Sequence, residues 1–171
     1  MKRVAIFVDG SNLFYTQKKM GWKMDVEKLL TYCRSFGEIV EATYYIGESS
    51  NESQKKYLDV LAYSGYSLRT KPIKAVYDHE TGQIVYKANL DVEMAIDIFN
   101  SVELYDQAIL VSGDSDFERA LFQLKSRGKE IKVISTRGIV ASELVRVAGV
   151  NYIDLQTIRE SLERKPEEEE F

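Results

Sequence analysis

Two short apolar runs in this chain each lead directly into aspartate residues. Residues 4–8 lead into Asp9, and residues 108–111 lead into a segment that contains Asp114 and Asp116. An apolar strand lies in the core, so an acid at its end lies where open α/β sheets bind ligands. Carboxylates that lie close together repel one another unless a proton or a cation lies between them. The pattern therefore predicts an acidic site for a hard divalent ion such as Mg²⁺ or Mn²⁺, which prefers oxygen ligands.

Two further acids, Asp91 and Asp97, lie on a predicted helix over residues 90–101. Six residues separate them by about 120° around a helix axis, so both side chains cannot point the same way. We prefer Asp91 as the ligand, because it lies at the start of the helix and close to Lys87. Asp97 is then expected either to hold a metal-binding residue in place or to pair with a basic side chain. Glu93 is expected to lie on the solvated face of the helix.

Each of the residues at the strand ends also has a purely structural interpretation. Asp9 could begin a turn or cap the helix that follows it. Asn12 could orient a bound water or phosphate through its amide, or it could satisfy backbone groups at a helix start. Residues 115–118 fit a capping box, which accounts for one of Asp114 and Asp116 but less well for both.

Basic and hydroxyl side chains near these acids are candidates for contacts with a substrate. Most scattered basic residues are solvated surface, but some could position a phosphate backbone. The expected substrate contacts are Ser112, Lys87, Arg119, Arg69 and Lys71, with Lys74 close to the last two. The chain also has eleven tyrosines, and some of their rings could stack on nucleic-acid bases.

The composition excludes several other kinds of chemistry. His79 is the only histidine and Cys33 the only cysteine, which rules out a histidine-rich zinc site and an internal disulfide. Serine and cysteine hydrolases usually need a histidine base, and His79 lies in a predicted turn. Cys33 is expected to be a small buried hydrophobic residue. The sequence has no glycine-rich phosphate-binding loop.

The net charge of −4 does not by itself indicate nucleic-acid binding. However, five of the 27 acids lie in residues 163–171, and the remaining 22 nearly balance the 23 bases. We expect a single domain over residues 1–163 and a disordered acidic tail over residues 164–171. The apolar run that ends at Asp9 is too short for a signal peptide or a membrane span, which predicts a cytoplasmic protein without a membrane partner.

The hydrophobic pattern alternates between strands and helices along the chain, which predicts a mostly parallel sheet in a three-layer α/β/α fold. The predicted strands are 3–8, 38–46, 66–74, 106–111, 130–135 and 151–154. The predicted helices are 12–20, 25–36, 51–64, 90–101, 115–126, 139–147 and 155–164. Residues 75–87, with a turn at 77–82, form a predicted hairpin inserted before the acidic helix.

Three motifs carry most of this information: Ile6-Phe-Val-Asp-Gly-Ser-Asn-Leu-Phe14, Lys87-Ala-Asn-Leu-Asp-Val-Glu-Met-Ala-Ile-Asp97 and Leu110-Val-Ser-Gly-Asp-Ser-Asp-Phe117. In this order they resemble the NYN domain family, specifically its bacterial LabA-like branch. The sequence departs from the family pattern at Ala88, where many relatives have glycine. Residues 148–151 also lack an aspartate that relatives often have. Neither departure removes a proposed ligand.

The resemblance implies a PIN-like fold with a divalent-metal-dependent nuclease site that acts on RNA. Carried over by motif, the metal-binding acids would be Asp9, Asp91, Asp114 and Asp116, and Asn12 would assist catalysis. In-line hydrolysis of a phosphodiester would leave a 5′-phosphate on the downstream product.

Three other functions remain open. A non-catalytic RNA-binding or regulatory module could keep the same fold and a retained metal site. A phosphotransferase of the haloacid dehalogenase kind also places an aspartate after its first strand, but it needs a second aspartate where this chain has Ser11. A purely structural partner-binding domain gives no reason to gather four acids. The sequence also leaves homo-oligomerisation open.

Overall fold

A computed structural model describes residues 1–166 of the chain. Six strands form one sheet in the order β3-β2-β1-β6-β7-β8, and all five neighbouring pairs run parallel. The strands are β1 (Arg3–Asp9), β2 (Glu38–Glu48), β3 (Ser67–Pro72), β6 (Gln107–Val111), β7 (Glu130–Ser135) and β8 (Tyr152–Asp154). The predicted parallel sheet is therefore confirmed.

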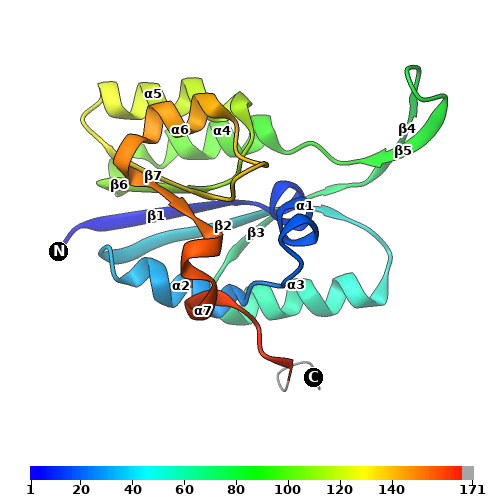
Figure 1. Cartoon of the computed structure of the whole chain (residues 1–171), viewed down its shortest axis with the longest axis horizontal. Helices are drawn as coiled ribbons and strands as arrows, with labels where there is room; N and C mark the ends of the chain where they lie inside the picture. Colours follow the sequence, from blue (N-terminus) through cyan, green and yellow to red (C-terminus); the bar gives the residue numbers. More distant parts are fainter. Residues whose placement is uncertain (167–171) are drawn as a thin grey trace.

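Helices lie on both sides of this sheet (Figure 1). On one side are α1 (Gly10–Met20), α2 (Val26–Arg34), α3 (Glu52–Ser64) and α7 (Arg159–Leu162); on the other are α4 (Asp91–Asn100), α5 (Glu118–Ser126) and α6 (Ser142–Ala148). The result is the three-layer, PIN-like α/β/α fold that the sequence predicts. No helix within residues 1–166 has the length and apolar character needed to span a membrane.

The central strand β1 contributes to two separate hydrophobic cores. Val4, Ile6 and Val8 pack with the α2 and α3 side, whereas Ala5 and Phe7 pack with the α4 and α5 side. All five side chains are fully buried. This arrangement explains why β1 is a continuous apolar run, since a parallel strand covered on both faces has no polar side.

The direction of chain progression across the sheet reverses between β1 and β6. From β1 the chain builds outward through β2 and β3, and from β6 it builds the other way through β7 and β8. Ligands of open α/β sheets bind in the crevice outside the carboxyl ends of the strands at such a point. Asp9 ends β1, and Asp114 follows β6 by three residues, so the topology brings both acids to this crevice.

A two-stranded antiparallel hairpin, β4 (Lys74–Asp78) and β5 (Gln83–Lys87), forms a second sheet and projects from the rest of the molecule (Figure 1). The sequence placed the end of the preceding strand at residue 74, but β3 ends at Pro72. Proline has no N–H to donate to a strand ladder, and the next N–H, that of Ile73, donates to the Glu48 carbonyl. The chain then leaves the main sheet and enters the hairpin.

Four helix starts differ from the sequence prediction by two or more residues. Helices α5 and α7 begin at Glu118 and Arg159 rather than at residues 115 and 155, because a 3₁₀ turn precedes each of them. Helix α1 begins at Gly10 rather than at residue 12, because the Asp9 side chain caps it by accepting from the Asn12 backbone N–H. Helix α6 begins at Ser142 rather than at residue 139. The backbone N–H of Ala141 donates to the Gly113 carbonyl, which ties the preceding loop to the end of β6.

The predicted acidic tail starts within the described residues, where the Arg164 backbone N–H donates to the Lys23 carbonyl. Its residues 167–171 lie outside the part of the chain that the structure describes.

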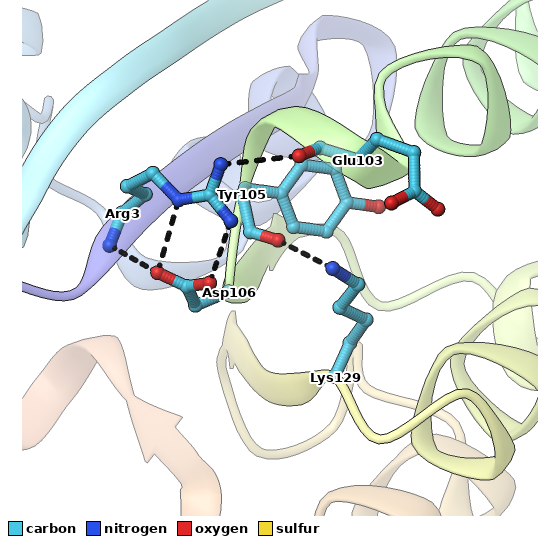
Figure 2. A network of polar contacts seen from close by, with 5 residues as sticks. All are labelled: Arg3, Glu103, Tyr105, Asp106 and Lys129. Atoms are coloured by element: carbon cyan, nitrogen blue, oxygen red, sulfur yellow. Dashed lines mark hydrogen bonds and ion pairs between the residues drawn. The ribbon is translucent and has the colours of Figure 1, made fainter.

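At the opposite end of the sheet from Asp9, an ion pair joins the starts of β1 and β6 (Figure 2). The backbone N–H and Nε of Arg3 donate to Oδ2 of Asp106 at 2.8 and 3.2 Å, and Nη2 donates to Oδ1 at 2.8 Å. Nη1 also donates to the Glu103 carbonyl, while Nζ of Lys129 donates to the Tyr105 carbonyl. These contacts with Arg3 hold the pKa of Asp106 well below its usual range.

We expect Arg3→Met to lower the thermal unfolding midpoint at neutral pH without changing divalent-ion binding at the other end of the sheet. Asp106 has a lowered pKa in the folded protein, so its stabilising contribution is present above about pH 4 and is lost as pH falls further. The difference between wild type and variant, followed by thermal denaturation, should therefore be constant near neutrality and shrink in acid. A difference that grows in acid would contradict the assignment.

Candidate metal site

Three aspartates from three different elements meet at the carboxyl edge of the sheet. One carboxylate oxygen from each of Asp9, Asp91 and Asp114 lies within 4.8 Å of the other two. Asp9 ends β1, Asp91 begins α4, and Asp114 follows β6. The three acids are separated widely in sequence, so only the fold brings them together.

Asp9 is held by hydrogen bonds from both sides of the crevice. Its Oδ1 accepts from the backbone N–H of Asn12 at 3.2 Å, and its Oδ2 accepts from the Ser112 hydroxyl at 2.8 Å. Asp9 is only 8% exposed. Its carboxylate therefore has a fixed orientation, and Ser112, which was expected to contact substrate, instead contacts Asp9 directly.

Asn12 joins helix α1 to the loop after β6. Its Oδ1 accepts from the Gly113 backbone N–H at 2.8 Å, so its amide oxygen satisfies a backbone group. A side chain at Gly113 would lie 2.8 Å from the Ser135 hydroxyl, and one at Gly10 would lie 2.4 Å from the Tyr45 carbonyl. The two glycines thus permit the close approach of backbone segments that forms this edge of the site.

Asp91 is positioned by Asn89, two residues before it. The Oδ1 of Asn89 accepts from the Asp91 backbone N–H at 2.8 Å, in place of the missing helical acceptor. Sequence reasoning did not single out Asn89, although asparagine often accepts a hydrogen bond from the backbone N–H two residues later in an Asx turn.

Crowding and burial both favour protons on the carboxylates of Asp9 and Asp91. Burial raises the pKa of Asp9, and repulsion from Asp114 adds to this effect, against the hydrogen bonds from Asn12 and Ser112. Burial, followed by the negative charges of Asp9, Asp114 and Asp116, raises the pKa of Asp91 to about 6. A cation among the three oxygens would relieve the same repulsion, so the donor set fits a hard divalent ion.

Asp114 and Asp116 occupy different positions, although the sequence treats them alike. Asp114 belongs to the group of three and also caps the short turn over residues 115–117, since its Oδ1 accepts from the Asp116 backbone N–H at 2.9 Å. Asp116 is exposed and lies outside the group, but its charge reaches Asp91. Asp116 could therefore act on a metal ion through water more readily than as a direct ligand.

Asp97 points away from the three acids. Its Oδ2 accepts from the Tyr45 hydroxyl and from Nε of Arg69, each at 3.0 Å. Of the two roles left open for Asp97, support of a metal ligand or pairing with a basic side chain, the structure shows the second. Glu93 likewise forms an ion pair with Lys71 at 2.5 Å instead of lying free on a solvated face. Arg69 and Lys71, both expected to contact substrate, thus bind acids of α4.

The remaining expected substrate contacts, Lys87 and Arg119, lie close in sequence to the elements of the site. Lys87 ends β5 and Arg119 lies on the first turn of α5, and both are exposed. His79 lies in the hairpin turn, with its ring 5.0 Å from that of Tyr77. Cys33 is buried in the last turn of α2, as expected for a small hydrophobic residue, and burial raises the pKa of its thiol to about 12.

Comparison with known proteins agrees with the fold and the motifs. The sequence pattern of the family described as NYN domain matches residues 3–156. The chain is 44% identical to the low amplitude and bright protein LabA of Synechococcus elongatus, over 99% of this chain and 92% of that protein. It is 26% identical to an uncharacterized protein of Methanocaldococcus jannaschii, over 95% of this chain and 61% of that protein.

A crystal structure of a Vibrio parahaemolyticus protein of unknown function has the same fold. It superposes with a TM-score of 0.81 at 22% identity and covers 95% of this chain and 96% of that one. This similarity supports the architecture alone.

We expect the metal-free protein to lose stability as pH rises from about 4 to about 6. Asp9 and Asp91 have raised pKa values in the folded state, so over this range the folded protein binds more protons than the unfolded chain does, and ionisation favours unfolding. Asp91→Asn should remove part of this loss and stabilise the protein by about 1 kcal/mol near pH 8, allowing for solvent screening of the part-exposed carboxylate. Thermal unfolding in EDTA measures both effects. If Asp91→Asn is destabilising at pH 8, the three acids do not repel one another as described.

We expect Asn12→Ala to cost about 1–2 kcal/mol of unfolding free energy, because it leaves the Gly113 N–H without its acceptor. The variant should also bind Mn²⁺ more weakly, since helix α1 loses its bond to the Asp114 loop and only the Ser112 hydroxyl still connects Asp9 to that loop. Chemical denaturation and Mn²⁺ titration provide the measurements. Asn100→Ala, at the exposed end of α4, is the matched control and should change neither quantity. Equal behaviour of the two variants would contradict the role assigned to Asn12.

Proposed function

The chain belongs to the NYN domain family, in its LabA-like branch, and from that premise we propose that it is a divalent-metal-dependent ribonuclease. The observation that carries the proposal is the meeting of Asp9, Asp91 and Asp114 within 4.8 Å at the switch point of the sheet. NYN domains belong to the PIN-like nuclease superfamily, and a cluster of three aspartates fits that activity. RNA as the substrate, and hydrolysis as the reaction, are the specific parts of the proposal.

Asp9, Asp91 and Asp114 are the residues that would hold Mg²⁺ or Mn²⁺, with Asp116 acting through water. A bound ion of this kind lowers the pKa of a water molecule and stabilises charge on phosphoryl oxygens. Ser112 and Asn12 hold the acids in position. The Ser112 hydroxyl donates to the Asp9 carboxylate, and the Asn12 side chain links helix α1 to the loop that carries Asp114. These contacts keep the acids in place when substrate binds.

The reaction adds water to phosphorus and breaks the bond to the 3′ oxygen of the upstream nucleotide. The upstream product then carries a 3′ hydroxyl, and the downstream product carries a 5′-phosphate. We expect Lys87 and Arg119 to contact the phosphate backbone, because both are exposed and lie close in sequence to acids of the site. Lys87 is four residues before Asp91, and Arg119 is three residues after Asp116. Arg69 and Lys71 would have to exchange their ion pairs with Asp97 and Glu93 to do the same.

We expect cleavage of end-labelled single-stranded and structured RNA to require Mg²⁺ or Mn²⁺ and to stop in EDTA. Asp9→Asn and Asp114→Asn should each reduce the rate at least 100-fold, because each removes one charge from the group that holds the ion. Asp59→Asn, on the exposed face of α3, is the matched control and should retain full activity.

Full activity in both site variants would contradict the assignment of the site. Divalent-ion binding without any cleavage, across a broad panel of RNAs, would instead indicate a non-catalytic RNA-binding module.

A further inference from the structure

The β4–β5 hairpin presents an aromatic and apolar face that is largely exposed, with a ring contact between Tyr77 and His79. Alternation along the two strands places Ala75 and Tyr77 of β4 on one face with Ile84 and Tyr86 of β5. Tyr86 is 73% exposed, Ile84 63% and Tyr77 56%. A two-stranded hairpin is at best marginally stable in water, so this face is suited to a partner that covers it.

The opposite face of the hairpin carries a pair of like charges at its base. Lys74 and Lys87 are directly opposite each other in the ladder, and within residues 1–166 neither side chain forms a hydrogen bond or a close ion pair, although the charge of Lys87 acts on Asp78 farther along the same face. Like charges directly opposite in an antiparallel pair are destabilising. An anionic ligand would relieve that repulsion. The hairpin is only two strands wide, about 5 Å between strand axes. Long lysine side chains on one face can therefore reach around its edge to phosphates of a strand bound on the other face.

The base of the hairpin is fixed next to the three aspartates. Only three residues separate Lys87 from Asp91, and one of them, Asn89, binds the Asp91 backbone N–H. A side chain at Gly47 would lie 2.8 Å from the Ala88 side chain and 2.9 Å from that of Ile73. The glycine therefore lets both ends of the hairpin pack against the carboxyl end of β2. A ligand that leaves the acidic site in this direction meets the hairpin next.

We propose that the hairpin is a binding arm for single-stranded RNA, on which Tyr77 and Tyr86 stack unpaired bases while Lys74 and Lys87 contact the adjacent phosphates. The two tyrosines are diagonal neighbours on one face, about 7–8 Å apart, so bases of one strand can reach both. Five residues of strand extend the contact about 17 Å from the site. This proposal rests on the proposed nuclease function, and it adds the substrate class: RNA with unpaired bases beside the cleaved bond.

A nucleic-acid strand accounts for both faces better than a second copy of this chain does. A second copy could cover the tyrosine face, but it would leave Lys74 and Lys87 repelling each other on the other face. The acids of the hairpin, Asp78 and Glu80, lie at its far end. A single strand brings flat bases for the aromatic rings and phosphates for the lysines in the same molecule.

Binding can be tested separately from cleavage with a fluorescein-labelled single-stranded oligouridine in EDTA, followed by fluorescence anisotropy. Tyr77→Ala with Tyr86→Ala should weaken binding at least about tenfold, because base stacking on an aromatic ring is lost at two positions. Tyr77→Phe with Tyr86→Phe keeps the rings and should bind as wild type does. Tyr63→Ala, a 93% exposed tyrosine on α3, is the matched control and should have no effect.

Lys74→Gln with Lys87→Gln should reduce the slope of log affinity against log salt by about 1.4, the value for two single-strand phosphate contacts. Duplex RNA, whose bases stack within the helix, should bind equally to wild type and to the tyrosine double alanine variant. Equal weakening for duplex and single strand would overturn the stacking assignment, and so would unchanged affinity for the single strand.

Sedimentation of wild type and variants decides whether a second copy occupies the hairpin instead. If the tyrosine double alanine variant converts a dimer into a monomer and single-strand affinity is unchanged, the hairpin is a dimer contact and the proposal fails. The nuclease proposal fails separately: hairpin-dependent binding without metal-dependent cleavage would leave the arm in place and remove the catalytic function. Metal-dependent cleavage that is equal in all hairpin variants would support the nuclease function and rule out the role of the hairpin as a binding arm.

Discussion

The crowding of negative charge at one edge of the sheet is the constraint on which the rest of this structure depends. Asp9, Asp91 and Asp114 approach within 4.8 Å, and burial raises the pKa of the first two. Asp9 and Asp114 also cap the helical turns that follow them, but capping does not require three acids to meet. The protein keeps them there at a cost in stability, which is a common feature of functional sites, and the surrounding hydrogen bonds serve to hold them in place.

The scaffold meets this constraint by placing the acids on elements that cannot easily move apart. β1 is buried on both faces, and β6 pairs with it along its whole length. Asn12 and Ser112 connect the acidic ends of these strands, while Arg3 and Asp106 connect their opposite ends. Asp91 comes from a third element, α4, whose start is fixed by Asn89. The hairpin enters α4 directly, so the most exposed part of the molecule is joined to its most constrained site.

Much of the fold could be predicted because its signals are local. The run Val4–Val8 is apolar at every position and ends in an acid, which indicates a buried strand with a polar end. The pairing of Asp97 with Arg69 and Tyr45 could not be predicted, because it depends on how α4 packs against β2 and β3. The helical spacing indicated only that Asp97 would point away from Asp91. The sequence also could not show that Asp114 joins the group of three acids while Asp116 does not. That difference depends on the geometry of the short turn over residues 115–117.

The most direct test of the central claim is calorimetric titration of the protein with Mn²⁺ in buffers of different ionisation enthalpy, at pH values near 6 and near 8. If the ion binds among Asp9, Asp91 and Asp114, it must displace the protons that burial and repulsion retain there. Binding near pH 6, close to the Asp91 pKa, should then release protons, and the release should be smaller near pH 8. Absence of binding, or binding with no proton release at either pH, would contradict the account.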